Sequence, residues 1–359
     1  CSLAADQKKN AVGVLLSGEG SDGTAGLQAI KAGGGTTFAQ SEETATHLSM
    51  PNSAIVSGSV DFILSPAGIA NKLGSGPWGG LHPDRSERGS KPKEEKTLDS
   101  ILALLHTAKG VEFGLYKRGT LRRRIQRRMT LKGVREPGKY LRILKADQVE
   151  LDQLFGDMLI SVTSFFREPE VFKALKSTIY PRLLKNRLSN APIRVWVPGC
   201  STGEEAYSHA MNLAEFLGPR VSQVPFHIFA TDVNPAVIEK ARTGLYSKKI
   251  KAAVSPERLR RFFTETKEGY RIVPEIRERC IFADKNLVQD PPFISLDLIS
   301  CRNLLIYMGP QLQEKAMQVF QYALKPRGIL MLGRSETTGD FSGAFSPLDP
   351  KKKIFSERT

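Results

Sequence analysis

The stretch Ile193-Arg-Val-Trp-Val-Pro-Gly-Cys-Ser-Thr-Gly-Glu-Glu205 decides the fold of the larger part of this chain. Four of its first five residues are apolar, all but Arg194, and the run predicts a buried strand. The glycines at 199 and 203 predict a tight turn, and the two glutamates begin a helix that we expect to run through Leu217. The G-x-x-x-G spacing is not the dinucleotide pattern G-x-G-x-x-G, and a plain turn would also account for it.

An acid at the end of the next predicted strand makes this loop more informative. Residues 226–231 form that strand, and Asp232 follows it. An acid at such a strand end can accept hydrogen bonds from a ribose diol, so the ligand is expected to carry an adenosine-like group. Neither a pyrophosphate loop nor a Walker lysine is present, which disfavours NAD and ATP. S-adenosylmethionine fits better, and an acid in the glycine loop suits its cationic part.

The remaining pattern divides the chain into four parts. Apolar residues and turns alternate as in a partial α/β domain over 1–73, and a Gly-, Pro- and charge-rich linker covers 74–96. Helical spacing predicts a small all-helical domain over 97–190. Residues 191–359 predict a doubly wound α/β sheet, with 353–356 as an edge strand. An insert at about 244–283 is expected to form a small β appendage from strands at 270–273 and 280–283.

Composition and charge narrow the function classes. The chain has 359 residues and a net charge of +15, yet residues 1–73 carry four basic and six acidic side chains, so the rest carries +17. No apolar run is long enough to span a membrane, so no membrane insertion is expected. The four cysteines and five histidines show no metal-ligand spacing, which predicts a reducing, cytoplasmic location and no metal. The chain begins without Met and in mid-pattern, and we expect it to be a fragment of a longer protein.

Several strings of residues together carry a family resemblance. They are Phe165-Phe-Arg-Glu168, Gly199-Cys-Ser-Thr-Gly-Glu-Glu205, Ala230-Thr-Asp232, Ala241-Arg-Thr-Gly-Leu-Tyr246, Asn286-Leu287, Cys301-Arg-Asn-Leu-Leu-Ile-Tyr307 and Gly333-Arg-Ser-Glu336. In this order they resemble the chemotaxis receptor methyltransferases (CheR) over about residues 98–358. The resemblance implies a protein-glutamate O-methyltransferase that uses S-adenosylmethionine, with the helical domain before a methyltransferase sheet.

The same resemblance implies the site residues. Cofactor binding is expected from these positions: Ser161, Thr163, Arg167, Glu205, Asp232, Asn286, Leu287, Arg302 and Asn303. Ser161 stands where the family has Asn, and a hydroxyl replaces one of the hydrogen bonds of an amide but not both. Arg167 and Tyr307 are the expected catalytic residues. A guanidinium fits a carboxylate bidentately, so Arg167 is expected to hold the acceptor glutamate, which is ionised at neutral pH and needs no general base.

The N-terminal part resembles the C-terminal piece of the chemotaxis methylesterase (CheB). Its matching strings are Val14-Leu-Leu-Ser-Gly-Glu-Gly-Ser-Asp-Gly23, Ala29-Ile-Lys, Met50-Pro51 and Val60-Asp61-Phe62. Asp22 matches the acid of the esterase triad, whereas the family's Ser and His lie upstream of this chain. Glu19 stands where that loop usually has Met. We therefore expect a fragment of a methylesterase–methyltransferase fusion whose esterase piece is inactive alone.

Residues 117–128 predict a basic helix, with seven cations in twelve residues and apolar side chains at 121, 125 and 129. The resemblance implies that this helix docks acidic helices of the cytoplasmic domains of chemoreceptors. The short, charged connection 264–269 in the β insert predicts recognition that does not depend on a receptor tail. Two other functions stay open at this point, a nucleic-acid methyltransferase and a catalytically inert signalling adaptor, although no nucleic acid is expected. The string Asp290-Pro-Pro-Phe293 resembles a motif of amino-methyltransferases but precedes its strand, and we interpret it as a turn.

Overall fold

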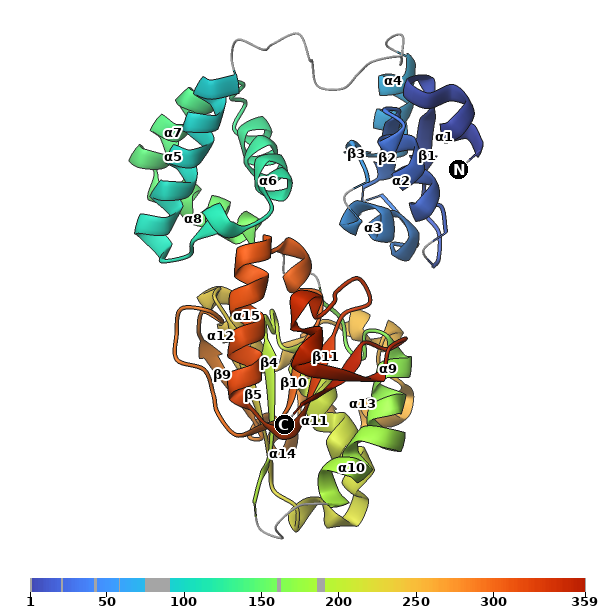
Figure 1. Ribbon diagram of the computed structural model, residues 1–359, viewed down its shortest axis with the longest axis vertical. Coiled ribbons are helices and arrows are strands. Elements are labelled where there is room, and N and C mark those ends of the chain that lie inside the picture. The colour runs from blue at the N-terminus through green and yellow to red at the C-terminus, as the bar shows by residue number, and fades with distance from the viewer. Residues whose placement is uncertain are drawn as a thin grey trace. The chain divides into compact units, whose positions relative to one another are not determined.

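The computed structural model describes residues 2–20, 22–41, 44–57, 59–74, 91–159, 163–185 and 191–358. The chain separates into two compact units, Cys1–Pro92 and Lys93–Thr359 (Figure 1). Each unit has its own hydrophobic clusters.

The first unit is a small parallel sheet with helices. Its strands lie in the order β1 (Val12–Leu15), β2 (Thr36–Gln40) and β3 (Phe62–Leu64). The helices are α1 (Ser2–Gln7), the 3-10 helix η1 (Lys8–Asn10), α2 (Thr24–Ala32), α3 (Ser49–Val56) and α4 (Pro66–Gly74). The prediction of a partial α/β domain over 1–73 agrees with this arrangement, and β2 is buried along its whole length.

The second unit begins with a helical part. It comprises α5 (Lys91–Lys109), the 3-10 helix η2 (Phe113–Leu115), α6 (Arg118–Leu131), α7 (Pro137–Ala146) and α8 (Gln148–Met158). Leu121, Ile125 and Met129 are buried in its core, as their spacing predicts. The start of α5 corrects the predicted linker 74–96, because residues 91–96 are helical. A proline early in a helix and acids in its first turns favour a helix start at this point. The high content of charged residues led instead to the prediction of a linker.

A seven-stranded sheet forms the rest of the second unit, in the order β12-β13-β11-β10-β4-β5-β9. The strands are β4 (Ile193–Pro198), β5 (Phe226–Asp232), β9 (Cys280–Asp284), β10 (Leu296–Cys301), β11 (Leu324–Leu332), β12 (Phe345–Asp349) and β13 (Ile354–Glu357). The strands β11, β10, β4, β5 and β9 are parallel, β13 pairs antiparallel with β11, and β12 pairs antiparallel with β13. This is the predicted doubly wound sheet.

Helices cover both faces of this sheet. Successive side chains of β4 point to opposite faces: Val195 and Val197 pack with α11 (Glu204–Leu217), and Trp196 packs with α15 (Pro310–Ala323). Figure 1 shows α15 lying along the strands. The other helices are α9 (Pro169–Ala174), the π-helix η3 (Leu175–Ile179), α10 (Tyr180–Lys185), η4 (Gly218–Ser222), α12 (Pro235–Thr243), η5 (Lys248–Ala252), α13 (Pro256–Phe262), α14 (Pro274–Arg277), η6 (Leu305–Tyr307) and η7 (Gly339–Gly343).

Two strand predictions need correction. The appendage is a separate sheet of β6 (Leu245–Tyr246), β8 (Tyr270–Ile272) and β7 (Phe263–Glu265), whereas the run 280–283 lies in the main sheet beside β5. Burial of Cys280 and Phe282 against the main core accounts for this position. The strand predicted at 353–356 is not an edge strand, because β12 pairs with its outer side. The strand β12 was not predicted because it contains Pro347, and proline is unfavourable inside a sheet. Proline is tolerated there because β12 is an edge strand.

Candidate functional site

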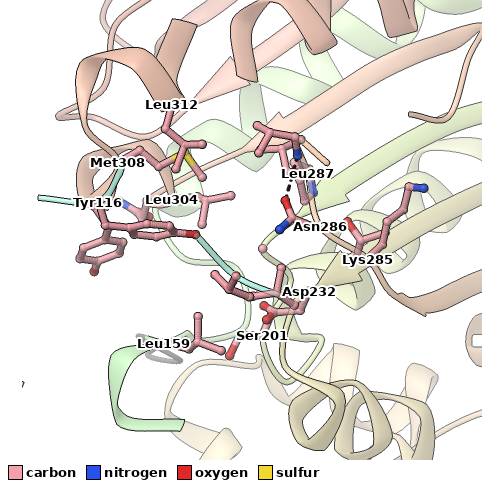
Figure 2. A pocket seen from close by; sticks show the side chains of 18 of the residues that line it. Tyr116, Leu159, Ser201, Asp232, Lys285, Asn286, Leu287, Leu304, Met308 and Leu312 are labelled. Carbon is pink, nitrogen blue, oxygen red and sulfur yellow. Dashed lines mark hydrogen bonds between the residues drawn. The ribbon is translucent and has the colours of Figure 1, made fainter. Parts of the chain in front are cut away.

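A cavity opens at the carboxyl ends of β4, β5 and β10, between the sheet and the helical part. Figure 2 shows side chains from both parts around it. All the sequence-predicted cofactor residues that the structure describes line this cavity: Thr163, Arg167, Glu205, Asp232, Asn286, Leu287, Arg302 and Asn303. Tyr307 lines it too. Ser161 lies outside the described residues. Asp22 belongs to the first unit, where its side chain is exposed.

The glycine loop reaches the cavity in a left-handed conformation. Gly199 has φ +66° and Gly203 has φ +94°, and Ser201 also has a positive φ of 50°. A Cβ at Gly199 would come within 2.9 Å of the Leu304 side chain, and one at Gly203 would come within 2.9 Å of Ala241. Glycine is required at both positions, because a larger residue would be both strained and crowded.

Asp232 is fixed by backbone amides at the tip of β5. The amide of Ser201 donates to Asp232 Oδ2 over 2.9 Å, and the amide of Asn234 donates to Oδ1 over 3.0 Å. Burial raises the pKa of Asp232, against the lowering effect of these amide hydrogen bonds. The carboxylate therefore joins the glycine loop to the second strand while it faces the cavity.

Glu205 lies in a different electrostatic setting, at the start of α11. Its Oε1 accepts a hydrogen bond from Ser300 Oγ over 2.8 Å, and Arg302 Nη1 binds both carboxylate oxygens at 3.0 and 2.9 Å. Burial opposes ionisation, but the charge of Arg302 and the hydrogen bonds together lower the pKa of Glu205 to about 2. His209, one turn along the helix, lies 3.6 Å from the same carboxylate. Glu205 is therefore a largely buried anion, 12% exposed, that is paired with Arg302.

Arg302 connects this anion to the loop that carries Arg167. Its Nη2 donates to the backbone oxygen of Arg167 over 2.8 Å and to Glu168 Oε2 over 2.9 Å, and its side chain is 1% exposed. Phe166 and Glu168, on either side of Arg167, have φ values of 50° and 61°. Bulky residues rarely adopt this conformation, which persists where surrounding contacts enforce it. Arg302 thus acts on the shape of the site through Glu205 and this loop.

Tyr307 stands near two arginines at the same end of the cavity. Burial raises the pKa of Tyr307, while the charges of Arg167 and then Arg124 act in the opposite direction. Arg124 is a half-buried arginine of α6. A carboxylate entering here would meet positive charge and a phenol that is protonated at neutral pH, and both can donate hydrogen bonds to it.

The segment that follows β9 forms another wall of the cavity. The amide of Asn286 donates to Asp290 Oδ2 over 2.7 Å, and Asn286 Oδ1 accepts from the amide of Val288 over 3.1 Å. Phe293 anchors the end of the segment with its ring 4.6 Å from that of Phe229. Residues 290–293 lie before β10, as expected, but the turn itself is at 287–289 and residues 291–293 have no regular structure. Leu287 presents an apolar surface beside the Asn286 amide, as a purine ring requires.

Three polar residues of the site were missed as site residues in the sequence. Ser300 supports Glu205, Tyr116 enters from the helical part, and Glu336 holds the loop after β10. The Glu336 carboxylate accepts hydrogen bonds from the amides of Asn303 (3.0 Å), Leu305 (2.8 Å) and Gly333 (2.5 Å). Glu336 is the last residue of the family string Gly333-Arg-Ser-Glu336, and its place in that string could have indicated that it belongs to the site. For Ser300 and Tyr116 the sequence gives no signal, because each acts through a contact with a distant residue.

Ion pairs inside the helical part occupy several cations of α6. Arg118 and Arg122 pair with Glu95, and Arg128 pairs with Glu150. Over the ranges that the structure describes, Arg123 and Arg127 have no ion pair and their side chains are exposed. The basic surface of α6 is therefore narrower than the sequence indicates.

The residues at the cavity fit S-adenosylmethionine. Asp232 offers acceptors for a ribose, Asn286 and Leu287 offer an amide and an apolar surface for a purine, and Gly199 allows close approach of the backbone.

Two absences hold for the part of the chain that the structure describes. No group of His, Cys, Asp or Glu suited to a metal ion occurs within the described ranges. None of the helices described has the length and apolar character of a membrane span.

Comparisons with known families agree with this geometry. Residues 161–354 match the CheR methyltransferase, SAM binding domain, and residues 96–159 match the CheR methyltransferase, all-alpha domain. Residues 1–73 match the CheB methylesterase family. S-adenosylmethionine is accordingly the cofactor of the second unit.

Three relatives illustrate how far the likeness extends. An uncharacterized 104.1 kDa protein of Rhodobacter capsulatus is 38% identical and covers 99% of this chain, which spans 39% of that protein's length. The chemotaxis protein methyltransferase of Listeria monocytogenes is 35% identical over 63% of this chain and 84% of its own length. The chemotaxis protein methyltransferase of Salmonella typhimurium is 33% identical over 68% and 85%. The chain therefore belongs to the CheR methyltransferase family, with a segment of CheB methylesterase ahead of the CheR domains.

Proposed function

We propose that the second unit transfers a methyl group from S-adenosylmethionine to glutamate side chains of the cytoplasmic domains of chemoreceptors. The observation that carries this proposal is the cavity itself. Asp232 faces it from β5, and Arg167 and Tyr307 face it from the loops near the helical part. A nucleoside and a carboxylate can thus occupy one cavity together. Membership of the CheR family supports the same reaction.

The bound cofactor supplies a sulfonium methyl group, which a carboxylate can attack directly. The chain needs no general base, because a glutamate is already ionised at neutral pH. Arg167 would hold the acceptor carboxylate through two parallel hydrogen bonds, and Tyr307 would donate a third. Holding the two reactants in line provides up to about 7–11 kcal/mol in favourable cases, so orientation is the main contribution that we assign to these residues.

Glu205 and Arg302 play a supporting part in this proposal. Since Arg302 neutralises Glu205, the pair adds little net charge to the cavity. We assign to it the placement of the Arg167 loop, through the backbone oxygen of Arg167. Asp232 keeps its carboxylate toward the ribose, and Thr163, Asn286, Leu287 and Asn303 contact the rest of the cofactor in this proposal. Ser161 remains an expectation from the family pattern.

We infer that the first unit has no esterase activity of its own. An esterase of the triad type needs a nucleophile, a base and an orienting acid, and only the acid, Asp22, has a counterpart here. Ser17 Oγ accepts a hydrogen bond from the amide of His47 over 2.8 Å, so these two residues hold a loop together.

Receptor docking is proposed at the outer side of α6. Arg123 and Arg127 are exposed there, next to the half-buried Arg124 that faces Tyr307. Such a contact should weaken steeply with salt.

The connection 264–269 closes in a tight turn in which the amide of Thr266 donates to Gly269 O over 2.7 Å. We therefore keep the proposal that recognition does not require a receptor tail.

The test is transfer of tritium from labelled S-adenosylmethionine to purified receptor membranes. Alkali should release the label as methanol, because a glutamyl ester is hydrolysed and a methylated base or amine is not. Label in tRNA or DNA under the same conditions would favour the nucleic-acid alternative. Binding of the cofactor without transfer to any acceptor would favour an inert adaptor. Repeating the assay with a tail-less receptor at low and high salt tests the docking proposal, and a strong tail requirement with weak salt dependence would overturn it.

A further inference from the structure

The segment around Tyr116 ties the helical part to the loop that carries Tyr307. Tyr116 forms an antiparallel bridge with Met308. The amide of Lys117 donates to Tyr307 O over 2.9 Å, and the amide of Gly309 donates to Leu115 O over 2.8 Å. These contacts fix the backbone of both segments relative to each other.

Gly309 shows how close this contact is. A Cβ at Gly309 would lie 2.6 Å from Leu115 O, a backbone atom that cannot move aside as a flexible side chain can. The two backbones therefore approach as closely as neighbouring strands. A side chain presented from Tyr116 keeps a defined position with respect to the cavity.

The Tyr116 side chain occupies the boundary between the two parts. It packs against the hydrophobic cluster of the helical part and against that around α15, and its ring lies 5.3 Å from that of Phe113. It also lines the cavity. In Figure 2, Tyr116, Leu304 and Met308 lie on one side of the cavity, and Ser201 and Asp232 lie on the other.

The electrostatics of Tyr116 point to a hydrogen-bond donor. Burial, and then the charge of Asp232, raise the pKa of Tyr116 to about 12. The phenol stays protonated at neutral pH, and it is near enough to Asp232 to sense that carboxylate. A neutral donor thus faces an acceptor across the space that we assign to the nucleoside.

We infer that Tyr116 is a cofactor-binding residue whose hydroxyl donates a hydrogen bond to the ribose of the cofactor, opposite Asp232. This inference rests on the proposed function, since it uses the proposed position of the nucleoside. The helical part then completes the cofactor site with a polar group of its own. Affinity for the cofactor depends on both parts of the second unit.

The test is calorimetric binding of S-adenosylhomocysteine to the full chain and to Tyr116→Phe. Loss of one neutral hydrogen bond should weaken binding about 5- to 10-fold, with the thermal unfolding midpoint unchanged. Tyr322→Phe is the matched control, because Tyr322 is 72% exposed on α15 and outside the cavity, and it should bind as the wild type does.

A second measurement locates the contact on the ligand. The 2′-deoxy and 3′-deoxy forms of S-adenosylhomocysteine should each bind the wild type more weakly. For one of them, Tyr116→Phe should cause no further loss, because the partner hydroxyl is already absent. Equal losses for all three ligands, or wild-type affinity in Tyr116→Phe, would overturn the inference and leave the proposed function intact. A wild-type chain that binds none of the ligands would overturn the proposed function itself.

Discussion

Glu205 and Asp232 are two partly buried carboxylates at the same edge of the sheet, yet their surroundings move their pKa values in opposite directions. Arg302 and Ser300 hold Glu205 ionised, with a pKa of about 2. Asp232 has amide donors, and within the described residues no lysine or arginine pairs with it, so burial raises its pKa. A carboxylate with its own cation serves the structure, whereas one without a cation is available to a ligand. The predictions below test this distinction.

The largest effect is expected for Arg302→Met, which leaves the largely buried Glu205 without its arginine and leaves Glu168 with only Arg334, 4.0 Å away. Removing one partner of a buried ion pair costs about 3–5 kcal/mol of unfolding free energy. Chemical denaturation measures it. The control Arg334→Met removes an arginine that pairs with Glu170 and lies 4.0 Å from Glu168 but is 66% exposed, so it should change stability by less than about 1 kcal/mol. Equal effects of the two variants would contradict the structural role of Arg302.

Asp232→Asn should act on the ligand more than on the fold. Loss of the charge-assisted hydrogen bonds to a ribose should weaken S-adenosylmethionine binding by about 2–4 kcal/mol, which is about 30- to 1000-fold. The amide oxygen still accepts one of the two backbone hydrogen bonds, so stability should fall less than in Arg302→Met. Calorimetry and denaturation on the same sample provide the comparison. Unchanged affinity would remove Asp232 from the site.

Arg167→Lys should keep the charge of the side chain and lose its planar pair of donors. If Arg167 holds the acceptor, turnover should fall by about 1–3 kcal/mol, or 5- to 150-fold, while the affinity for S-adenosylhomocysteine stays within about twofold. Arg220→Lys, in the exposed η4, is the matched control and should be silent. Loss of cofactor binding with normal turnover of the bound complex would instead assign Arg167 to the cofactor.

The pH dependence of stability compares the two carboxylates directly, and they should show opposite trends. The lowered pKa of Glu205 gives stability that is present above its unfolded pKa of about 4.3 and is lost as the pH falls toward 2. The difference between wild type and Glu205→Gln should therefore shrink on acidification. The raised pKa of Asp232 predicts that wild type loses stability relative to Asp232→Asn as the pH rises above about 3.9. Parallel curves for the two variants would refute the contrast drawn above.

Much of the fold was predictable because burial repeats along the sequence. Residues 193–197 alternate between the two faces of the sheet, and Leu121, Ile125 and Met129 follow one face of a helix. The residues of a strand alone do not determine which sheet the strand joins. The run 280–283 reads the same in an appendage as in the main sheet, and only its register with β5 decides. Residues 345–349 were missed because a proline at an edge strand resembles a loop.

The candidate site divides in the same way. The expected cofactor residues that line the cavity were predicted by resemblance, since most of them lie in short strings typical of the family. Their mutual support was not predictable, because Glu205, Ser300 and Arg302 meet only after β4 and β10, about a hundred residues apart, have paired. Tyr116 is separated from Asp232 by more than a hundred residues, and no local pattern indicates that their side chains share an electrostatic environment.

The loop that holds Phe166 and Glu168 in the left-handed conformation contains an amide whose hydrogen exchange can be followed in solution. The amide of Phe166 donates to Ser208 Oγ over 2.9 Å, in a buried contact between the Arg167 loop and α11. Exchange of this one proton with deuterated solvent requires the loop to leave α11, so its rate reports how often Arg167 loses its place. Unfolding of the whole unit sets the slowest rate, and any faster exchange measures the loop itself. The exchange rate of the Phe166 amide therefore measures how often the Arg167 loop opens, and the measurement needs neither substrate nor turnover.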